Sequence, residues 1–351
     1  MSALYPFDID LLPPMFHSFD SPILLRAIIS ARTELAELKG YISGISRPNL
    51  FFSLITQEAV ASLVIDNIHT TVESVLQQDL LPDDKQDIAS RNALYYISII
   101  KSGSIRPVEF YLSSYGIRNM HANISSESDS FREYGNYVET PPVGKPFWSP
   151  SYKQVPYLVK DWEKFVNNPC SVVDSLVKCI LSYYQLEAIH PFEDDCGQIS
   201  RMTLMIHLVR EKIITHPILL VSNYIKDNHT EYYRLMRAVT TDNKWDNFIL
   251  FMLRGFELQA RATREKLFNI LNLYHELLNK SNNLSHNTNA LMEHIFTFPV
   301  TSSEKAAEDL KIDVELASKY LDELSNTGIL ERNATISHNF YFNRALLNII
   351  N

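Results

Sequence analysis

The chain has 351 residues, of which 46% are hydrophobic and 21% charged, and its formal net charge is −9. This length indicates two or three structural units, and an acidic chain gains little from counterion release, which argues against broad binding of DNA or RNA. Three cysteines, Cys170, Cys179 and Cys196, make no disulfide framework and fit a reducing compartment. The chain starts without a signal-peptide pattern and has no membrane-length apolar run, so we expect a cytoplasmic protein.

Helical patterns dominate the first part of the chain. Residues 1–20 are rich in Pro and Phe and are expected to be extended. From Ser21 the apolar spacing is helical, and Gly40 is a plausible end for that helix. A second helical stretch covers residues 56–67, and we assign residues 1–105 to an N-terminal helical segment.

The middle of the chain changes character and then becomes helical again. Residues 117–150 are rich in Ser, Asn, Gly and Pro with short β-prone pieces, which indicates a flap or short hairpin. Helicity resumes after Pro156, and we assign residues 106–278 to one core unit. Further helices are predicted in residues 171–188, from near Gly197 to about Lys212, and in residues 229–265.

The last part of the chain reads as a separate unit. Residues 279–289 form a polar linker, and residues 290–351 predict three helices and a β-wing, which resembles a winged helix-turn-helix. Ser303 and Asp313 are candidate helix caps, and Gly328 is a candidate terminator. The candidate recognition helix has one Lys against four acidic residues, which favours a structural or protein-binding role over DNA binding. These residues are Lys319, Asp313, Glu315, Asp322 and Glu323.

The run from His190 to Arg201 places a helix end, a tight loop and a new helix start together. A helix N-terminus accepts phosphate, and Arg201 in its first turns would lean towards that phosphate. Asp194 supplies a hard oxygen for Mg²⁺, and His190 could take a proton from a hydroxyl. This pattern indicates phosphoryl or nucleotidyl transfer. The plainer alternatives are a histidine at a helix end, an acidic helix cap and a surface arginine.

The same run resembles the Fic family signature, His-Pro-Phe-x-Asp/Glu-Gly-Asn-Gly-Arg-x-x-Arg. The matching positions are His190, Pro191, Phe192, Asp194, Gly197 and Arg201. The resemblance implies a mainly α Fic-type core with a short β flap. It implies that His190 is the general base, that Asp194 holds Mg²⁺, and that the loop and Arg201 hold the phosphates of ATP. The implied reaction moves AMP onto a Ser, Thr or Tyr hydroxyl of a target protein.

Three loop positions depart from the signature. Asp195 replaces a Gly, Cys196 replaces the Asn and Gln198 replaces the first Arg. Their positions make Cys196 and Gln198, like Gly197, nucleotide-binding candidates by resemblance. A carboxylate roughly 5 Å from a phosphate costs on the order of 3 kcal/mol at an effective dielectric of about 20, so we expect weakened activity. The alternative is an inactive nucleotide- or partner-binding regulatory module. A reactive thiol is the less favoured role for Cys196, because acidic neighbours raise the pKa of a thiol.

Residues 57–71 resemble the inhibitory helix of the family, Ser/Thr-x-x-x-Glu-Gly/Asn. Ser62 and Asn67 match, and Asp66 takes the place of the Glu. The resemblance implies that Asp66 pairs with Arg201 and that the protein inhibits itself. Because Asp is one methylene shorter than Glu, we expect a longer and weaker pair. Alternatively, these residues are a polar helix edge with Asn67 as the C-cap.

The resemblance extends beyond the two motifs. Residues 222–237 and 245–255 are similar to the core helices of the family. Residues 131–150 stand where the family has a flap that holds an extended target segment by strand addition. The implied partners are a nucleotide and a target protein, or the chain itself, and a homodimer is possible.

Overall fold

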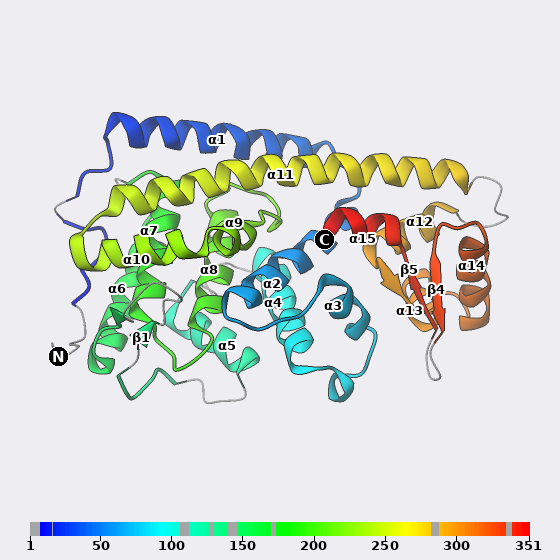
Figure 1. The fold of residues 1–351 in the computed structure, drawn as a ribbon, viewed down its shortest axis with the longest axis horizontal. Coiled ribbons are helices and arrows are strands. Elements are labelled where there is room, and N and C mark those ends of the chain that lie inside the picture. Colours follow the sequence, from blue (N-terminus) through cyan, green and yellow to red (C-terminus); the bar gives the residue numbers. More distant parts are fainter. Residues whose placement is uncertain are drawn as a thin grey trace.

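The computed structural model is an elongated, mainly α-helical protein, as the sequence predicts (Figure 1). Two long helices, α1 and α11, run side by side along one edge, and a small unit with a sheet occupies the end opposite the N-terminus. The structure describes residues 8–15, 17–105, 112–125, 130–135, 137–138, 147–169, 173–281, 288–334 and 339–351. Cys170 lies outside the described residues, as does most of the predicted linker.

The N-terminal segment begins with α1, capped by Ser21, whose Oγ accepts a hydrogen bond from the N–H of Leu24. The prediction that this helix ends at Gly40 was wrong. The buried face continues through Leu38 and Ile42, and packing outweighs the low helix propensity of Gly40. The elements of this segment are α1 (Pro22–Ser43), η1 (Pro48–Phe51), α2 (Ser53–Ile65), α3 (Val72–Gln78), η2 (Asp83–Lys85) and α4 (Ile88–Ile105).

The core unit is built on α7 and α8, whose residues are almost all buried. Residues 229–265 are helical, as predicted, and form two helices, because Asn243 adopts a left-handed conformation with φ 55° and ends the first. The second continues to Lys280. The elements are α5 (Ser114–Ile124), β1 (Tyr137–Val138), β2 (Phe147–Trp148), η3 (Tyr152–Gln154), α6 (Val155–Asn167), α7 (Ser175–Ile189), α8 (Cys196–Arg210), α9 (Val221–Asp227), α10 (His229–Asp242) and α11 (Trp245–Lys280).

The predicted flap contains an antiparallel pair of short strands, β1 and β2. Tyr137 pairs with Trp148, and Val138 pairs with Phe147. This pairing confirms the predicted short hairpin, although residues 139–146 within it lie outside the described part of the chain.

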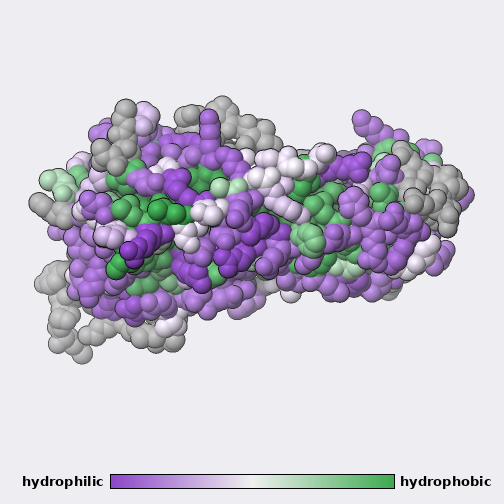
Figure 2. Space-filling model, turned by 90° about the horizontal axis from the view of Figure 1, so that it is seen from above, coloured by the Kyte–Doolittle hydropathy of each residue, from purple (hydrophilic) through white to green (hydrophobic). Residues whose placement is uncertain are grey.

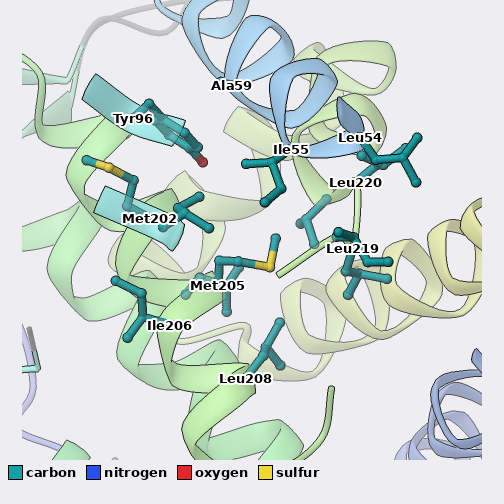
Figure 3. Packing of buried hydrophobic residues seen from close by; sticks show 14 of the residues in the cluster. Leu54, Ile55, Ala59, Tyr96, Met202, Met205, Ile206, Leu208, Leu219 and Leu220 are labelled. Carbon is teal, nitrogen blue, oxygen red and sulfur yellow. The ribbon is translucent and has the colours of Figure 1, made fainter. Parts of the chain in front are cut away.

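The hydrophobic core passes directly behind the predicted site. Figure 3 shows the apolar face of α8 beneath α2, with Tyr96 of α4 at one side. Met202, Met205 and Ile206 of α8 are each no more than 1% exposed, as are Leu54 and Ile55 of α2. The position of α2 on α8 is therefore fixed by apolar packing as well as by polar contacts.

The C-terminal unit combines three helices, a three-stranded antiparallel sheet and a final helix that was not predicted. The sheet order is β3-β5-β4. The cap of α13 is Ser302 rather than Ser303, and Asp313 holds the N-cap position of α14 without a side-chain cap bond. Gly328, with φ 75°, follows α14 as predicted. The elements are α12 (Thr288–Thr297), β3 (Val300–Thr301), α13 (Ser303–Leu310), α14 (Val314–Asn326), β4 (Glu331–Ala334), β5 (Asn339–Phe342) and α15 (Arg344–Ile350).

Helix α15 returns from this unit to the rest of the molecule. Lys266 of α11 donates hydrogen bonds from Nζ to the carbonyl oxygen of Ile349, 2.9 Å away, and to Oε1 of Gln57 on α2, 3.0 Å away. Arg344 of α15 pairs with Glu73 of α3, 2.5 Å away. The C-terminal unit is thus tied to the helix α2 that carries the predicted inhibitory residues.

The face that carries α1 and α11 is mostly hydrophilic, with hydrophobic side chains interspersed (Figure 2). Exposed apolar side chains occur near the beginning of α1, at Ile23, Leu25 and Ile29. Within the described ranges, no helix combines the length and apolar character needed to cross a bilayer.

Candidate active site

His190 lies where α7 ends and the loop to α8 begins. It adopts the left-handed conformation, with φ 49°, and its N–H bonds to the carbonyl oxygen of Leu186 at 3.2 Å. Burial, together with the nearby Arg132 guanidinium, lowers the pKa of His190 to about 4. The imidazole is therefore neutral at neutral pH and able to accept a proton.

Arg132 fixes this turn from outside the signature. Its Nε donates to the carbonyl oxygen of His190 at 2.7 Å, and its backbone N–H donates to that of Pro191 at 3.0 Å. Its guanidinium also donates to the carbonyl oxygens of Tyr134 and Pro150, on either side of the hairpin. Arg132 thus joins the two ends of the flap to His190, the candidate general base. Sequence reasoning missed it, because a lone Arg 58 positions before its partner leaves no local pattern.

The loop after His190 is closed by Cys196. Its Sγ accepts a hydrogen bond from the N–H of Phe192 at 3.2 Å and donates to the carbonyl oxygen of the same residue at 3.3 Å. Burial raises the pKa of the Cys196 thiol, so it is protonated and poorly nucleophilic. The side chain of Cys196 is thus engaged within the loop by the backbone of Phe192.

Two other departures from the signature contact each other. Asp195 precedes α8 in the left-handed conformation with φ 58°, the region that a Gly would occupy without strain. Gln198 is fully buried and donates from Nε2 to Oδ1 of Asp195 at 2.7 Å. The side chain of Gln198 therefore holds the substituting carboxylate.

Arg201 is held by α2. Its Nε donates to Oγ of Ser62 at 2.7 Å, and its Nη2 donates to the carbonyl oxygen of Ser62 at 3.0 Å. The same Nη2 lies 2.6 Å from Oδ2 of Asp66. The expectation of a longer contact was wrong: α2 lies close enough over α8 for the shorter carboxylate to make a short contact. The guanidinium is 2% exposed and the Asp66 side chain 24% exposed.

Gly197 lies directly beneath this pair. A Cβ at Gly197 would lie 2.8 Å from Nη1 of Arg201 and 2.9 Å from Oδ1 of Asp66. Both distances are shorter than a carbon atom tolerates, so the approach of Arg201 and Asp66 requires a glycine here. The predicted loop glycine, clamp arginine and inhibitory acid are thus assembled at one point.

Asn67 ends α2 in the way its sequence position suggests. It adopts the left-handed conformation, with φ 60°. Its N–H bonds to the carbonyl oxygen of Val64, and the N–H of Ile68 bonds to that of Leu63. These two bonds make a Schellman motif, which orients Asp66, the residue just before Asn67, towards Arg201.

A buried carboxylate on α2 was also missed. Glu58 is 1% exposed and accepts hydrogen bonds from both the N–H and the hydroxyl of Ser222, at the start of α9. Burial raises the pKa of Glu58 to about 7. Glu58, Ser62 and Asp66 recur every four residues, so they lie along one face of the helix.

The site has the donors that a bound nucleotide needs. The N-terminus of α8 presents backbone N–H groups at residues 196–198, where phosphate oxygens bind readily. Asp194 is exposed beside them. Among the described residues no group of three or more His, Cys, Asp or Glu could hold a metal unaided. Mg²⁺ needs only one or two carboxylates when phosphates complete its shell, and Asp194 fits that donor set.

A cavity opens beside this loop on the flap side. Its volume is about 280 Å³, and Glu193 of the loop and Arg132 contribute to its wall. His121 of α5, which also lines it, stacks on Phe192 with ring centroids 4.1 Å apart. The cavity therefore lies between the residues that precede the hairpin and the loop that follows His190.

Two family models match the chain in succession. The model described as Fic/DOC family N-terminal matches residues 25–104, and the model described as Fic/DOC family matches residues 111–208. The matches together cover about half of the chain, and the second includes the turn from His190 to Arg201.

Solved structures show the same fold. A Fic family protein from Desulfovibrio desulfuricans G20 has a TM-score of 0.59 at 18% identity, covering 92% of this chain and 96% of that chain. A Fic domain containing signaling protein from Bacteroides thetaiotaomicron has a TM-score of 0.52 at 13% identity, covering 68% and 96%. Fic-1 from C. elegans has a TM-score of 0.53 at 14% identity, covering 70% and 74%. At these identities the likeness concerns the fold alone.

Proposed function

The chain belongs to the Fic/DOC family, whose general activity is AMPylation or nucleotide transfer, and on that premise we propose that it is a self-inhibited protein adenylyltransferase. Its substrates would be Mg-ATP and a Ser, Thr or Tyr hydroxyl of a protein. The observation that carries the proposal is the placement of a neutral His190 one loop away from Arg201 and the N-terminus of α8.

In the proposed reaction, the target hydroxyl oxygen attacks the α-phosphorus of ATP. The bond from that phosphorus to the oxygen bridging to the β-phosphate breaks, pyrophosphate leaves, and His190 takes the hydroxyl proton. Backbone N–H groups at the start of α8 and the Arg201 guanidinium stabilise the phosphate charge. Mg²⁺, held by Asp194 and the phosphates, would neutralise charge on the leaving group.

Self-inhibition is supported by the contacts of Arg201. Ser62 and Asp66 occupy Nε and Nη2 of its guanidinium, the atoms that would otherwise face a phosphate. A nucleotide must displace Asp66 or bind in a shifted position, and either outcome slows transfer.

The altered loop supports low activity. The carboxylate of Asp195 adds negative charge at the helix start, and Gln198 supplies an amide where the family supplies a cation. The same Gln198–Asp195 contact favours the second candidate, a non-catalytic nucleotide- or partner-binding regulator, because a loop with its own internal bond is stable without a nucleotide.

Transfer of label from α-phosphate-labelled ATP distinguishes these candidates. The full chain would be incubated with Mg²⁺ and labelled ATP, alone for self-modification and with cell extract for a protein target. The proposal expects slow labelling that disappears in His190→Ala. Titration of Arg201→Ala with Mg-ATP should show at least about tenfold weaker binding. Nucleotide binding without His190-dependent labelling would favour the regulator, and unchanged affinity in Arg201→Ala would refute the site. A homodimer would be detected by light scattering in parallel.

A further inference from the structure

Glu187 is a buried acid that the reaction described above does not use. It lies on α7, one turn before His190, and its side chain is 3% exposed. Its Oε2 is buried and has no hydrogen-bond partner among the described residues. A buried carboxylate oxygen without a partner is costly, so its retention beside the active loop calls for a physical explanation.

The groups whose charges interact with Glu187 come from four helices. Arg201 and Ser200 of α8 lower its pKa, and the charge of Asp66 on α2 raises it. Burial is the largest effect and raises the pKa of Glu187 to about 6. The tyrosine hydroxyls that feel its charge are Tyr183 of α7 and Tyr232 and Tyr233 of α10, and the Cys196 thiol feels it as well.

The acidic residues that interact with Arg201 therefore lie on two different helices, α2 and α7. Asp66 and Glu58, which both interact with its charge, lie on α2. Glu187 lies on α7, which is packed against α8 in the centre of the core. A phosphate that displaces Asp66 from Arg201 leaves Glu187 in place, because Glu187 lies on a different helix.

We propose that Glu187 is a positioning residue: the counter-ion on the core helix that holds the Arg201 guanidinium in place when Asp66 is displaced. This inference rests on the proposed function in one respect, that a phosphate is the group that displaces Asp66. Removing the partner of a buried cation is strongly destabilising, because an uncompensated charge remains. Oε2 of Glu187 makes no hydrogen bond while Asp66 is paired with Arg201, so it is a buried acceptor that remains open when Asp66 is displaced.

The pKa of Glu187 depends on whether Asp66 is paired with Arg201. While Asp66 is paired with Arg201, its negative charge favours the protonated form of Glu187. When Asp66 leaves, that repulsion ends while the attraction to Arg201 remains, so the pKa of Glu187 falls further below neutral pH and the group stays a carboxylate. Glu187 on α7 then replaces Asp66 on α2 as the counter-ion of Arg201, so the buried cation is never left without one.

The test is a double-mutant cycle in the full chain without nucleotide. Asp66→Asn and Glu187→Gln would be measured singly and together by the urea midpoint of unfolding near neutral pH. We expect a small shift from Glu187→Gln alone, and a shift in the double variant that clearly exceeds the sum of the two single shifts. Additive shifts would overturn the proposal.

Two further arms separate a counter-ion from a packing role. The excess shift should vanish when Arg201→Met is introduced into all members of the cycle, since no cation then needs compensation. It should also shrink as the pH is lowered below the pKa of Glu187, which is about 6 with Asp66 present and lower without it, because a protonated Glu187 compensates no charge. An excess that persists with Arg201→Met, or that does not vary with pH, would refute the inference. Glu193→Gln, at an exposed acid of the same loop, is the matched control and should be additive with Asp66→Asn.

Because these measurements use no nucleotide, they are independent of the proposed activity. If labelling by ATP fails and the cycle shows the excess, Glu187 positions Arg201 in a binding module. If labelling succeeds and the cycle is additive, the transferase proposal stands and the role of Glu187 is refuted.

Discussion

Nε2 of Gln198 donates a hydrogen bond to Oδ1 of Asp195 at 2.7 Å, so two of the three departures from the Fic signature are partners of each other. Asp195 takes the N-cap position of α8 and Gln198 lies three residues later. This is the spacing of a capping box, although here the two side chains bond directly. The altered loop is therefore a coherent local structure, and its residues should not be reverted independently.

Reversion of these positions should accordingly be cooperative. Asp195→Gly alone leaves Gln198 as a buried amide without its acceptor, and Gln198→Arg alone places a cation against Asp195 instead of a phosphate. We expect the Asp195→Gly, Gln198→Arg pair to raise His190-dependent labelling by about tenfold or more over the product of the single effects. Initial rates with labelled ATP measure this.

Cys196→Asn is a useful addition to that series. It replaces a buried thiol that closes the loop onto Phe192, so its effect on stability must be followed by thermal unfolding. A folded triple variant that binds ATP without labelling anything through His190 would mean that the chemical defect lies outside the loop.

Release of α2 should have a large effect. Because the Arg201–Asp66 contact is short and its cation is buried, Asp66→Gly removes a stronger restraint than an exposed pair would provide. We expect Mg-ATP affinity to rise by at least about tenfold, equivalent to ~1.4 kcal/mol, in calorimetric titration. Glu276→Gly, which breaks an exposed pair with Lys280 on α11, is the control and should leave that affinity unchanged. Equal affinities for Asp66→Gly and wild type would remove the case for inhibition by α2.

The sequence was sufficient to predict the features that depend on single residues or on residues adjacent in the chain. Ser21 and Gly328 begin and end helices as expected, because capping and positive φ are properties of single residues. The turn from His190 to Arg201 was predictable because its residues are contiguous. The partnership of Arg201 with residues 62–66 could be stated only through the family resemblance, since it joins positions 135 or more apart.

Long-range packing accounts for what was missed. Arg132 and Glu58 act through backbone groups distant in sequence, and no spacing rule reveals such partners. Helix α15 was not predicted because its anchor, Lys266, lies on another helix. The length of the Asp66–Arg201 contact was misjudged for the same reason: it depends on how closely α2 lies on α8, which apolar packing determines.

The C-terminal unit should not bind DNA in a sequence-specific way. On α14, Glu315 and Lys319 are exposed, and Asp322 is engaged by Arg332 and by the hydroxyl of Tyr341. This surface offers little positive charge to phosphates and few donors to base edges. A selection from random duplexes at low salt should return no enriched motif, and recovery of one motif that Lys319→Glu abolishes would contradict this expectation.

Glu58 should make the stability of the protein depend on pH. Its pKa is raised by burial from 4.5 to about 7 in the folded protein, so the folded state binds this proton more tightly than the unfolded state. The stability that this proton provides is fully present below about pH 4.5 and is lost as the pH rises through about 7, a change of ~3 kcal/mol. Glu58→Gln removes the titration and keeps an oxygen acceptor for Ser222. Buried His190 and His207, whose pKa values are lowered to about 4, give an opposite slope at lower pH, so the quantity to compare is the difference between variant and wild type.

We expect the free energy of unfolding of Glu58→Gln, minus that of wild type, to increase between about pH 5 and pH 8. Urea unfolding at several pH values measures it. Glu276→Gln, at an exposed acid of α11 paired with Lys280, is the matched control, and its difference from wild type should stay constant. A Glu58→Gln difference that is flat across this range, or that falls, would show that the carboxylate is ionised in the folded protein and stabilised by Ser222 and Arg201 together. Glu58 would then be ionised while α2 is in place. Release of α2 would have to separate a charged Glu58 from Ser222.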